Sequence, residues 1–179
     1  MVNNHNVTRI SLLVEGYPRL GFKVFAQLSK QSSNSICITR LHPDYVAEKF
    51  GVRSRKCYWL SGVKGKDIIS PKSIGQMVKL IKTQAKEGKP LVLLDGLEYM
   101  LLWNDMSKVM SAFSEIDAIL AASGGSMVIC MDPLTMEQKD LERLTASFPK
   151  AENIEAEAVS DPEDAFGVKK ERSGSVGMA

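Results

Sequence analysis

The fold of this chain is decided by one segment, Leu91-Val92-Leu93-Leu94-Asp95-Gly96-Leu97-Glu98-Tyr99-Met100. Its four leading aliphatic residues predict a strand that is buried on both faces, as in the parallel sheets of α/β domains. The strand ends at Asp95, and the carboxyl end of such a strand is where α/β proteins form their ligand crevice. In nucleotide triphosphatases an Asp in this place helps to hold the magnesium ion of the nucleotide. The segment therefore raises the question of whether the rest of the chain could bind a nucleotide.

Apolar runs and helical stripes alternate along the chain on both sides of this segment. Strands are expected at 9–15, 35–40, 57–61 and 126–131, and helices after residue 18, at 43–50, from 71 to about 87, at 105–122 and at 136–148. This alternation predicts a three-layer α/β/α sandwich around a mostly parallel sheet of about five strands, joined by right-handed crossovers. The order of the strands does not follow from the pattern.

Two local patterns set the expected starts of the third and the last helix. Ser70-Pro71 has the form of an N-cap followed by proline at the first helical position. Thr135-Met136-Glu137-Gln138 has the form of a capping box. For the short helix at 43–50, His42-Pro43 is expected at the start and Gly51 at the end.

A length of 179 residues suits one domain, which we expect over residues 1–150, followed by a polar, flexible tail over 151–179. Within the tail, Ile154 to Val159 could add a short edge strand. The composition is that of a soluble globular protein, with a net charge of +2 that gives no argument for nucleic-acid or membrane-surface binding. The chain has neither a run of ~18 apolar residues nor a signal-peptide pattern, so a cytoplasmic location is expected.

The three cysteines, Cys37, Cys57 and Cys130, all lie within apolar runs. Their spacing matches no metal-binding pattern, and an odd number suits no disulfide framework. The cysteines are therefore predicted to be reduced, buried thiols, and neither a metal nor another cofactor is predicted.

The turn after the first strand has part of a phosphate-binding loop. Gly16 and Gly21 have the spacing of G-x-x-x-x-G-K-[ST], but Phe22 stands where the lysine should be, and Lys23 comes one position late. On a helix one position is a rotation of ~100°, which directs the ammonium away from the loop. Val24 lacks the hydroxyl that magnesium requires. Gly16, Gly21 and Lys23 are thus at most a remnant of a phosphate loop, and a strand-to-helix turn that needs glycine explains the pattern better.

Charged residues lie at or just beyond the ends of the predicted strands, namely Glu15, Arg40, Asp95, Glu98 and Asp132. Because parallel strands end at one edge, we expect Arg40, Asp95, Glu98 and Asp132 to lie together there. Such a ring could bind a cation or a polar ligand, or it could be a structural network in which Arg40 neutralises the carboxylates. The structural account is favoured, since no nucleophile or metal-ligating histidine joins the group.

An apolar stretch follows the fourth strand and contains Tyr99, Met100, Leu101, Trp103 and Met106. Core packing accounts for such residues if they are buried. If they are exposed, they mark a contact surface. The sequence leaves both interpretations open.

Four motifs occur in a fixed order along the chain: Ile38-Thr39-Arg40-Leu41-His42-Pro43, Tyr58-Trp59-Leu60-Ser61, Leu93 to Met100 with Asn104, and Ile129-Cys130-Met131-Asp132-Pro133. In these motifs the chain resembles the archaeal domain-of-unknown-function family 835, over about Ile10 to Phe148. The resemblance implies no established activity, and it implies relatives that occur alone or joined to sensory and signalling modules. The family's "LLDG" segment is similar to the second acidic strand of RecA-like and KaiC-like ATPases, whereas the phosphate loop is generally absent.

The residues and the resemblance together favour a non-catalytic regulatory or signalling-associated interaction module, with a degenerate nucleotide-triphosphatase-like fold and a protein partner. The alternative is a nucleotide- or small-ligand-binding protein that uses Asp95 and Glu98, with at most weak Mg-dependent ATPase activity. The turn from Gly16 to Phe22 separates these hypotheses. Backbone amides that converge on an empty site would favour the binding of a nucleotide or another ligand. A side chain of Tyr17, Arg19 or Leu20 that fills this site would oppose such binding.

Overall fold

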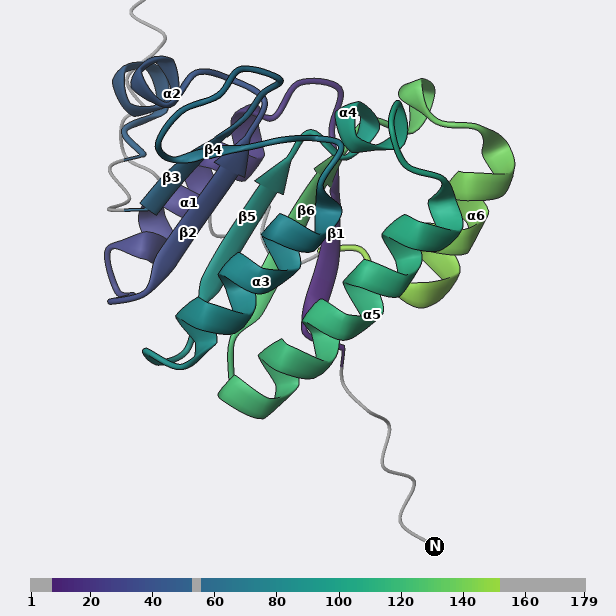
Figure 1. Cartoon of the computed structure of the whole chain (residues 1–179). Coiled ribbons are helices and arrows are strands. Elements are labelled where there is room, and N and C mark those ends of the chain that lie inside the picture. Colours follow the sequence, from purple (N-terminus) through teal and green to yellow (C-terminus); the bar gives the residue numbers. More distant parts are fainter. Residues whose placement is uncertain (1–7, 53–55, 152–179) are drawn as a thin grey trace, which may run out of the picture.

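Six strands form one sheet in the computed structural model, which describes residues 8–52 and 56–151 (Figure 1). The strands are β1 (Ile10–Val14), β2 (Ser35–Thr39), β3 (Lys56–Leu60), β4 (Ile68–Ile69), β5 (Leu91–Asp95) and β6 (Ser126–Met131). Their order is β1-β6-β5-β2-β3-β4, and every neighbouring pair is parallel. The predicted α/β class is confirmed. The sheet has one strand more than expected, because the two-residue β4, too short to leave a periodic signal, pairs with the end of β3.

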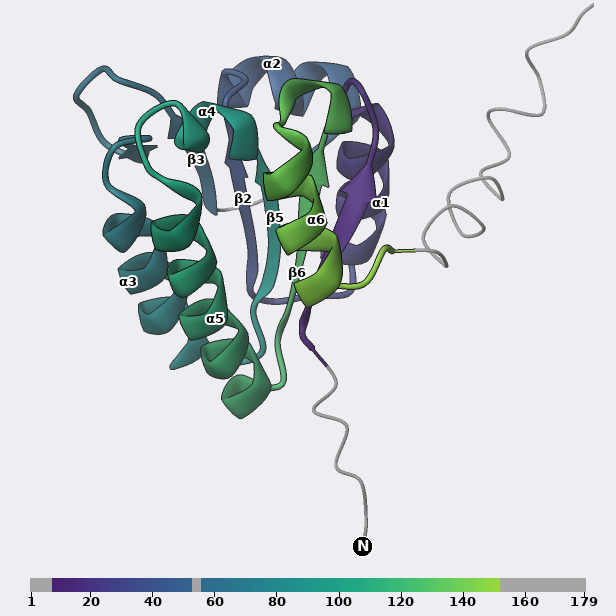
Figure 2. The same ribbon diagram turned by 90° about the vertical axis from the view of Figure 1, so that its right-hand side faces the viewer.

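Helices cover both faces of the sheet and make the three expected layers (Figures 1 and 2). One face carries α1 (Arg19–Ser29) and α2 (Pro43–Phe50), and the other carries α3 (Ile74–Ala85), α5 (Met106–Ser123) and α6 (Gln138–Ser147). The short helix α4 (Leu97–Leu101) and the 3-10 helix η1 (Pro133–Thr135) follow directly on β5 and β6. They lie at the carboxyl ends of the strands, at the top of Figure 1.

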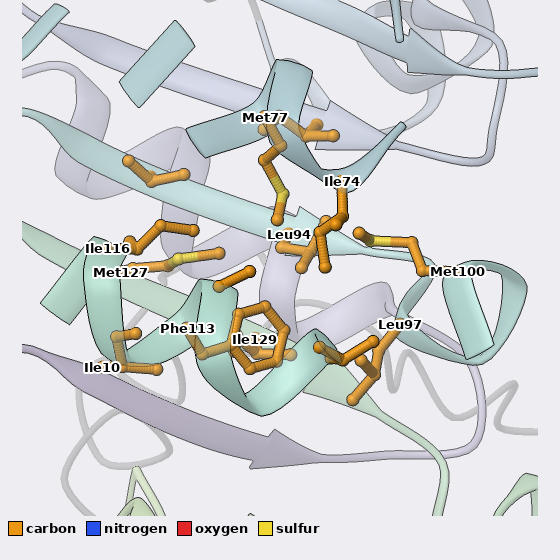
Figure 3. Close-up of a cluster of buried hydrophobic side chains, with 14 of the residues drawn as sticks. Ile10, Ile74, Met77, Leu94, Leu97, Met100, Phe113, Ile116, Met127 and Ile129 are labelled. Carbon is orange, nitrogen blue, oxygen red and sulfur yellow. The ribbon is translucent and has the colours of Figure 1, made fainter. Parts of the chain in front are cut away.

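Strand β5 contributes to two separate hydrophobic cores. Val92 and Leu94 pack into the larger core, under α3, α5 and α6 (Figure 3). Leu93 points to the opposite face and packs with Phe22 and Phe25 of α1. Successive strand side chains alternate between faces, so the aliphatic run is buried on both sides, as the sequence predicts.

The predicted start of the third helix is wrong. Helix α3 begins at Ile74, with Ser73 as the preceding residue, and not after Ser70-Pro71. The backbone is still forming β4 at Ile69, and the carbonyl of Pro71 accepts a hydrogen bond of 2.8 Å from the buried side-chain amide of Asn104. These contacts hold Ser70-Pro71 in a turn ahead of the helix.

The predicted capping box at the start of the last helix is also wrong. Helix α6 begins at Gln138, two residues later than expected, and follows η1. The hydroxyl of Thr135 donates to the carbonyl of Asp132 at 2.7 Å and so belongs to the 3-10 turn. It is therefore unavailable to cap α6.

The predicted ends of α2 are confirmed. The Nδ1 atom of His42 accepts the N–H of Asp44 at 3.2 Å, which caps the first turn. Gly51 ends the helix in the left-handed conformation, at a φ of 68°, which glycine adopts without strain.

The last described residues run beside β1. The N–H of Leu12 donates to the carbonyl of Pro149, and the N–H of Ala151 donates to the carbonyl of Leu12, both at 2.8 Å. The possible strand from Ile154 to Val159 and the rest of the expected tail lie outside the described residues. Within the described part of the chain, every helix is too short or too polar to cross a membrane.

Candidate functional site

The carboxyl ends of β2 and β5 mark the place where the chain changes from one face of the sheet to the other. These strands are neighbours, and Thr39 pairs with Asp95 at their ends. Helix α2 follows β2 onto one face, whereas α5 follows β5 onto the opposite face (Figure 2). Open α/β sheets form their ligand crevice at such a switch point.

Asp95 is a buried carboxylate at this switch point, with only 2% of its surface exposed. The hydroxyl of Thr39 donates to its Oδ2 atom at 2.9 Å and itself accepts the N–H of Leu41 at 3.0 Å. Burial raises the pKa of Asp95 to about 6, although the Thr39 hydrogen bond and the nearby Arg40 charge oppose this rise. Asp95 therefore titrates near neutral pH.

Arg40 joins two of the predicted carboxylates. Its guanidinium contacts the Oε1 atom of Glu98 through Nη1, and its Nε atom lies 3.7 Å from Oδ1 of Asp95. Its backbone is held on both sides, because its N–H donates to the carbonyl of Asp95 at 3.1 Å and its carbonyl accepts Nε1–H of Trp59 at 3.1 Å. Three of the four residues expected to cluster thus come together, with one guanidinium between two carboxylates.

Asp132, the fourth residue, makes its contacts at another strand end. Its Oδ1 atom accepts the N–H of Leu134 at 2.9 Å and caps η1. Its Oδ2 atom faces the turn after β1, where it would lie 3.8 Å from a Cβ atom added to Gly16. The contacts described for Asp132 lie within η1 and at the turn after β1, and none of them joins it to Arg40. The residue closes a local turn instead.

Glu15 occupies the place where a nucleotide-binding turn would hold a phosphate. Its Oε2 atom accepts the N–H of Leu20 and its Oε1 atom accepts the N–H of Gly21, each at 2.9 Å. These are the first-turn amides of α1, which is where anions bind at helix N-termini. Burial raises the pKa of Glu15, whereas the two amide hydrogen bonds act in the opposite direction. The amides of Leu20 and Gly21 are therefore not an empty binding site. The group that fills the site is the carboxylate of Glu15, and not a side chain of Tyr17, Arg19 or Leu20, the residues considered from the sequence.

In the amino-acid sequence Glu15 stands out only as one of several acidic residues at strand ends. The signal that could have revealed its role is its position, five and six residues before two helical amides across a tight glycine turn. An acidic side chain there can satisfy the N–H groups that a helix start leaves unpaired.

Gly21, the second glycine of the remnant, has a structural explanation. A Cβ atom on Gly21 would collide with Sγ of Cys130 and lie 3.1 Å from Oε1 of Glu15, so glycine allows α1 to pack closely on β6. Lys23 lies in the next turn of α1, past both amides that bind Glu15. Helix packing thus explains the glycine at Gly21 without a phosphate.

A groove of about 500 Å³ opens beside the Arg40 group. We call it the edge groove. Arg40 and Glu98 supply its charged part, and Trp59, Tyr99 and Leu102 supply most of its apolar surface. The groove lies along the carboxyl ends of β2, β3 and β5, so its lining comes from segments far apart in the sequence.

Large hydrophobic side chains are exposed along the same edge of the sheet. In the described residues seven are exposed, and each lies at the end of a strand or in the segment that follows one: Val14, Tyr17, Tyr45, Val63, Leu102, Trp103 and Leu134. We call these seven residues the edge surface. Leu134 and Leu102 are the most exposed, at 93% and 74%.

The edge surface answers the question left open for the apolar stretch after β5. Met100 and Met106 are core residues, and Tyr99 and Leu101 are partly buried against the core. Trp103, in contrast, is 53% exposed, with the ammonium of Lys72 4.0 Å from the centre of its ring. Core packing therefore accounts for the other four residues, whereas Trp103 is exposed.

Among residues 8–52 and 56–151, no three His, Cys, Asp or Glu side chains converge as metal ligands. A comparison with curated proteins finds no match. A comparison with protein families finds one over residues 18–148, which include β2 to α6, the edge groove and all four sequence motifs. The chain belongs to this family, which is described as "Protein of unknown function (DUF835)".

Proposed function

We propose that this protein is a non-catalytic interaction module that binds a protein partner through its edge surface. The observation that carries the proposal is the gathering of the exposed large hydrophobic side chains at one edge of the sheet. Single exposed hydrophobic residues are common on proteins, whereas several of them along one edge of a sheet are more typical of a contact site. Aromatic residues and arginine, both present here, are the types enriched in interface centres.

The charges beside the edge surface support binding rather than catalysis. Arg40 is paired with Glu98 and Asp95, and the carboxylate of Glu15 is bonded to two backbone amides. A partner that covers this edge would therefore bury charges that already have partners, which lowers the desolvation cost of association. We further propose that this role is regulatory or belongs to signalling in the cytoplasm, because of the family resemblance.

Site-specific photo-cross-linking tests the proposed surface. A photoreactive residue is placed at Leu102 or Leu134, and matched control residues are placed at Lys82 and Glu115, which are exposed on α3 and α5 away from this edge. In an extract of the source organism, we expect the same partner to be cross-linked from both edge positions and from neither control position. Equal products at all four positions, or none at the edge, would contradict the proposal.

Charge substitutions give a second measurement of the same surface. For this measurement the photoreactive residue is placed at Trp103. The double variant Leu102→Asp/Leu134→Asp should abolish its cross-link, because both substituted side chains are exposed and the apolar contacts that they make with the partner would be lost. The melting temperature should stay within a few degrees, as expected for surface substitutions. Ser111→Asp, on the exposed side of α5, is the matched control and should leave the cross-link unchanged.

A small-ligand or nucleotide site remains the second candidate, favoured by the position of Asp95 and Glu98 beside the edge groove at the switch point. Because Glu15 already occupies the first-turn amides of α1, we expect millimolar ATP with magnesium to leave the melting temperature unchanged. A ligand at a hundred times its Kd would add ~2.7 kcal/mol to the free energy of unfolding. A clear shift in the wild type that disappears in Asp95→Ala would establish the ligand-binding role instead.

A further inference from the structure

Cys37 and Cys57 face each other across neighbouring parallel strands. The residues are register partners in β2 and β3, and both belong to the smaller core on the α1 and α2 face. Neighbouring strands lie ~4.8 Å apart, and residues in register point to the same face of the sheet. A disulfide requires a Cα separation of about 4.4–6.8 Å, so the backbone already has the spacing that would allow one.

The two thiols differ in exposure and in acidity. Cys37 is fully buried, whereas Cys57 is only partly buried. A hydrogen bond from the Cys37 thiol lowers the pKa of Cys57, although burial and the carboxylates of Asp44 and Asp67 oppose this change. The same hydrogen bond, together with burial, raises the pKa of Cys37 well above its ordinary value. The thiol of Cys57 is thus the less buried and the more acidic of the two, and that of Cys37 lies beside it on the neighbouring strand.

Cys130 provides a contrast within the same core. It is buried, and burial raises its pKa well above the ordinary value. It lies on β6, which β5 separates from β2, so two strand spacings, or roughly 10 Å, separate it from Cys37. That distance is too great for a disulfide.

We propose that Cys37 and Cys57 form a reversible dithiol–disulfide pair that is oxidised by hydroperoxides. In the first step the Cys57 thiolate attacks a peroxide oxygen, the O–O bond breaks, and the departing hydroxide takes up a proton to form water. Cys57 becomes a sulfenic acid and has lost two electrons to the peroxide. The sulfur of Cys37 then attacks the sulfur of Cys57, and the displaced hydroxide leaves as a second water with the Cys37 proton. Hydrogen peroxide and two thiols thus give one disulfide and two waters.

Thiol counting on the full chain tests the proposal. The reduced wild-type protein is treated with an equimolar amount of hydrogen peroxide, its free thiols are alkylated under denaturing conditions, and its peptides are identified by mass spectrometry. We expect the free thiols to fall from three to one, with Cys37 and Cys57 linked and Cys130 alkylated. Dithiothreitol should restore all three thiols.

Single substitutions separate the roles of the two sulfurs. Cys37→Ser should stop at a sulfenic acid on Cys57 that dimedone traps, Cys57→Ser should keep both remaining thiols, and Cys130→Ser should form the same disulfide as the wild type. The wild-type result stands even if one variant fails to fold. Retention of all three thiols would overturn the proposal. So would a disulfide to Cys130, a disulfide between two chains, or oxidation of Cys57 beyond sulfenic acid while Cys37 stays free.

Discussion

Asp95 shows how a single residue depends on its surroundings. In a solvated loop its carboxyl would be charged at any pH near neutral, but at the end of β5 it lies beneath Arg40 and Thr39 with little contact with water. Loss of hydration disfavours the charged form more than these two neighbours favour it, and the pKa rises to about 6. A raised carboxyl pKa of this kind is a cost to the folded state at neutral pH.

The pH dependence of stability tests this description. The ordinary pKa of Asp95 is 3.8, so between this value and about 6 the folded protein holds a proton that the unfolded chain has lost. Stability from Asp95 is therefore present at low pH and falls as the pH rises through 6. We expect urea unfolding at pH 5 and at pH 7 to differ more in the wild type than in Asp95→Asn, by about 1 kcal/mol, because about one pH unit of the interval in which the folded protein holds the extra proton lies above pH 5. The raised pKa of Glu15 acts in the same direction in both proteins and cancels in the comparison.

Asp132→Asn is the control and should behave like the wild type. An equal pH dependence of stability in Asp95→Asn and the wild type would contradict the prediction.

Helices α1 and α3 show how one residue type serves different purposes in different elements. In α1, Gly21 lets the helix approach Cys130 of β6 closely, and its amide binds Glu15. In α3, a Cβ atom on Gly75 would meet no atom within 4 Å. Glycine is therefore required by packing in the first helix, whereas in the second it lowers helix stability with no contact in return.

Matched glycine substitutions test this difference. Gly21→Ala should lower the free energy of unfolding by about 1–3 kcal/mol, because the new methyl group overpacks the contact with Cys130. Gly75→Ala should raise it by up to about 1 kcal/mol. Chemical denaturation of both variants measures the two effects. The double variant Gly21→Ala/Cys130→Ala should recover part of the loss, and strict additivity of the two substitutions would show that the Cys130 contact is not the cause.

The whole molecule consists of two cores that share one sheet, so neither layer of helices is independent of the other. The larger core and the smaller core meet at β5 and β6, whose successive side chains point to opposite faces. The described chain closes the β1 edge with the hydrogen bonds that join Leu12 to Pro149 and Ala151. Residues up to Ala151 are therefore joined to the sheet by hydrogen bonds.

Truncation tests the domain boundary. A chain that ends at Ala151 keeps every described contact and should have the melting temperature of the full chain. A chain that ends at Phe148 loses both hydrogen bonds to Leu12 and should be less stable by about 1–3 kcal/mol. Thermal unfolding followed by circular dichroism measures both. A large loss of stability in the longer truncation would show that residues after 151 belong to the folded domain.

The amino-acid sequence by itself determined the class of fold and much of the local structure. The aliphatic run before Asp95 identified a strand buried on both faces, and His42 and Gly51 marked the ends of α2, because burial patterns and helix caps depend on residues close together in the chain. The sequence also showed that Phe22 stands where a phosphate-binding loop would have its lysine. The resemblance carried by the motifs also led to the correct family.

Only the tertiary structure decided how these elements meet. It placed β6 between β1 and β5, so that Asp95 and the turn at Gly16 are not on neighbouring strands. It also brought Arg40 to Glu98, gave Asp132 a separate role, and filled the first-turn amides of α1 with the carboxylate of Glu15. Strand order and these contacts join residues distant in the chain, and their energies depend on burial and geometry that no local pattern contains. The exposed hydrophobic edge arises in the same way, since side chains at the ends of five different strands, or in the segments that follow them, come to one edge only after the sheet has formed.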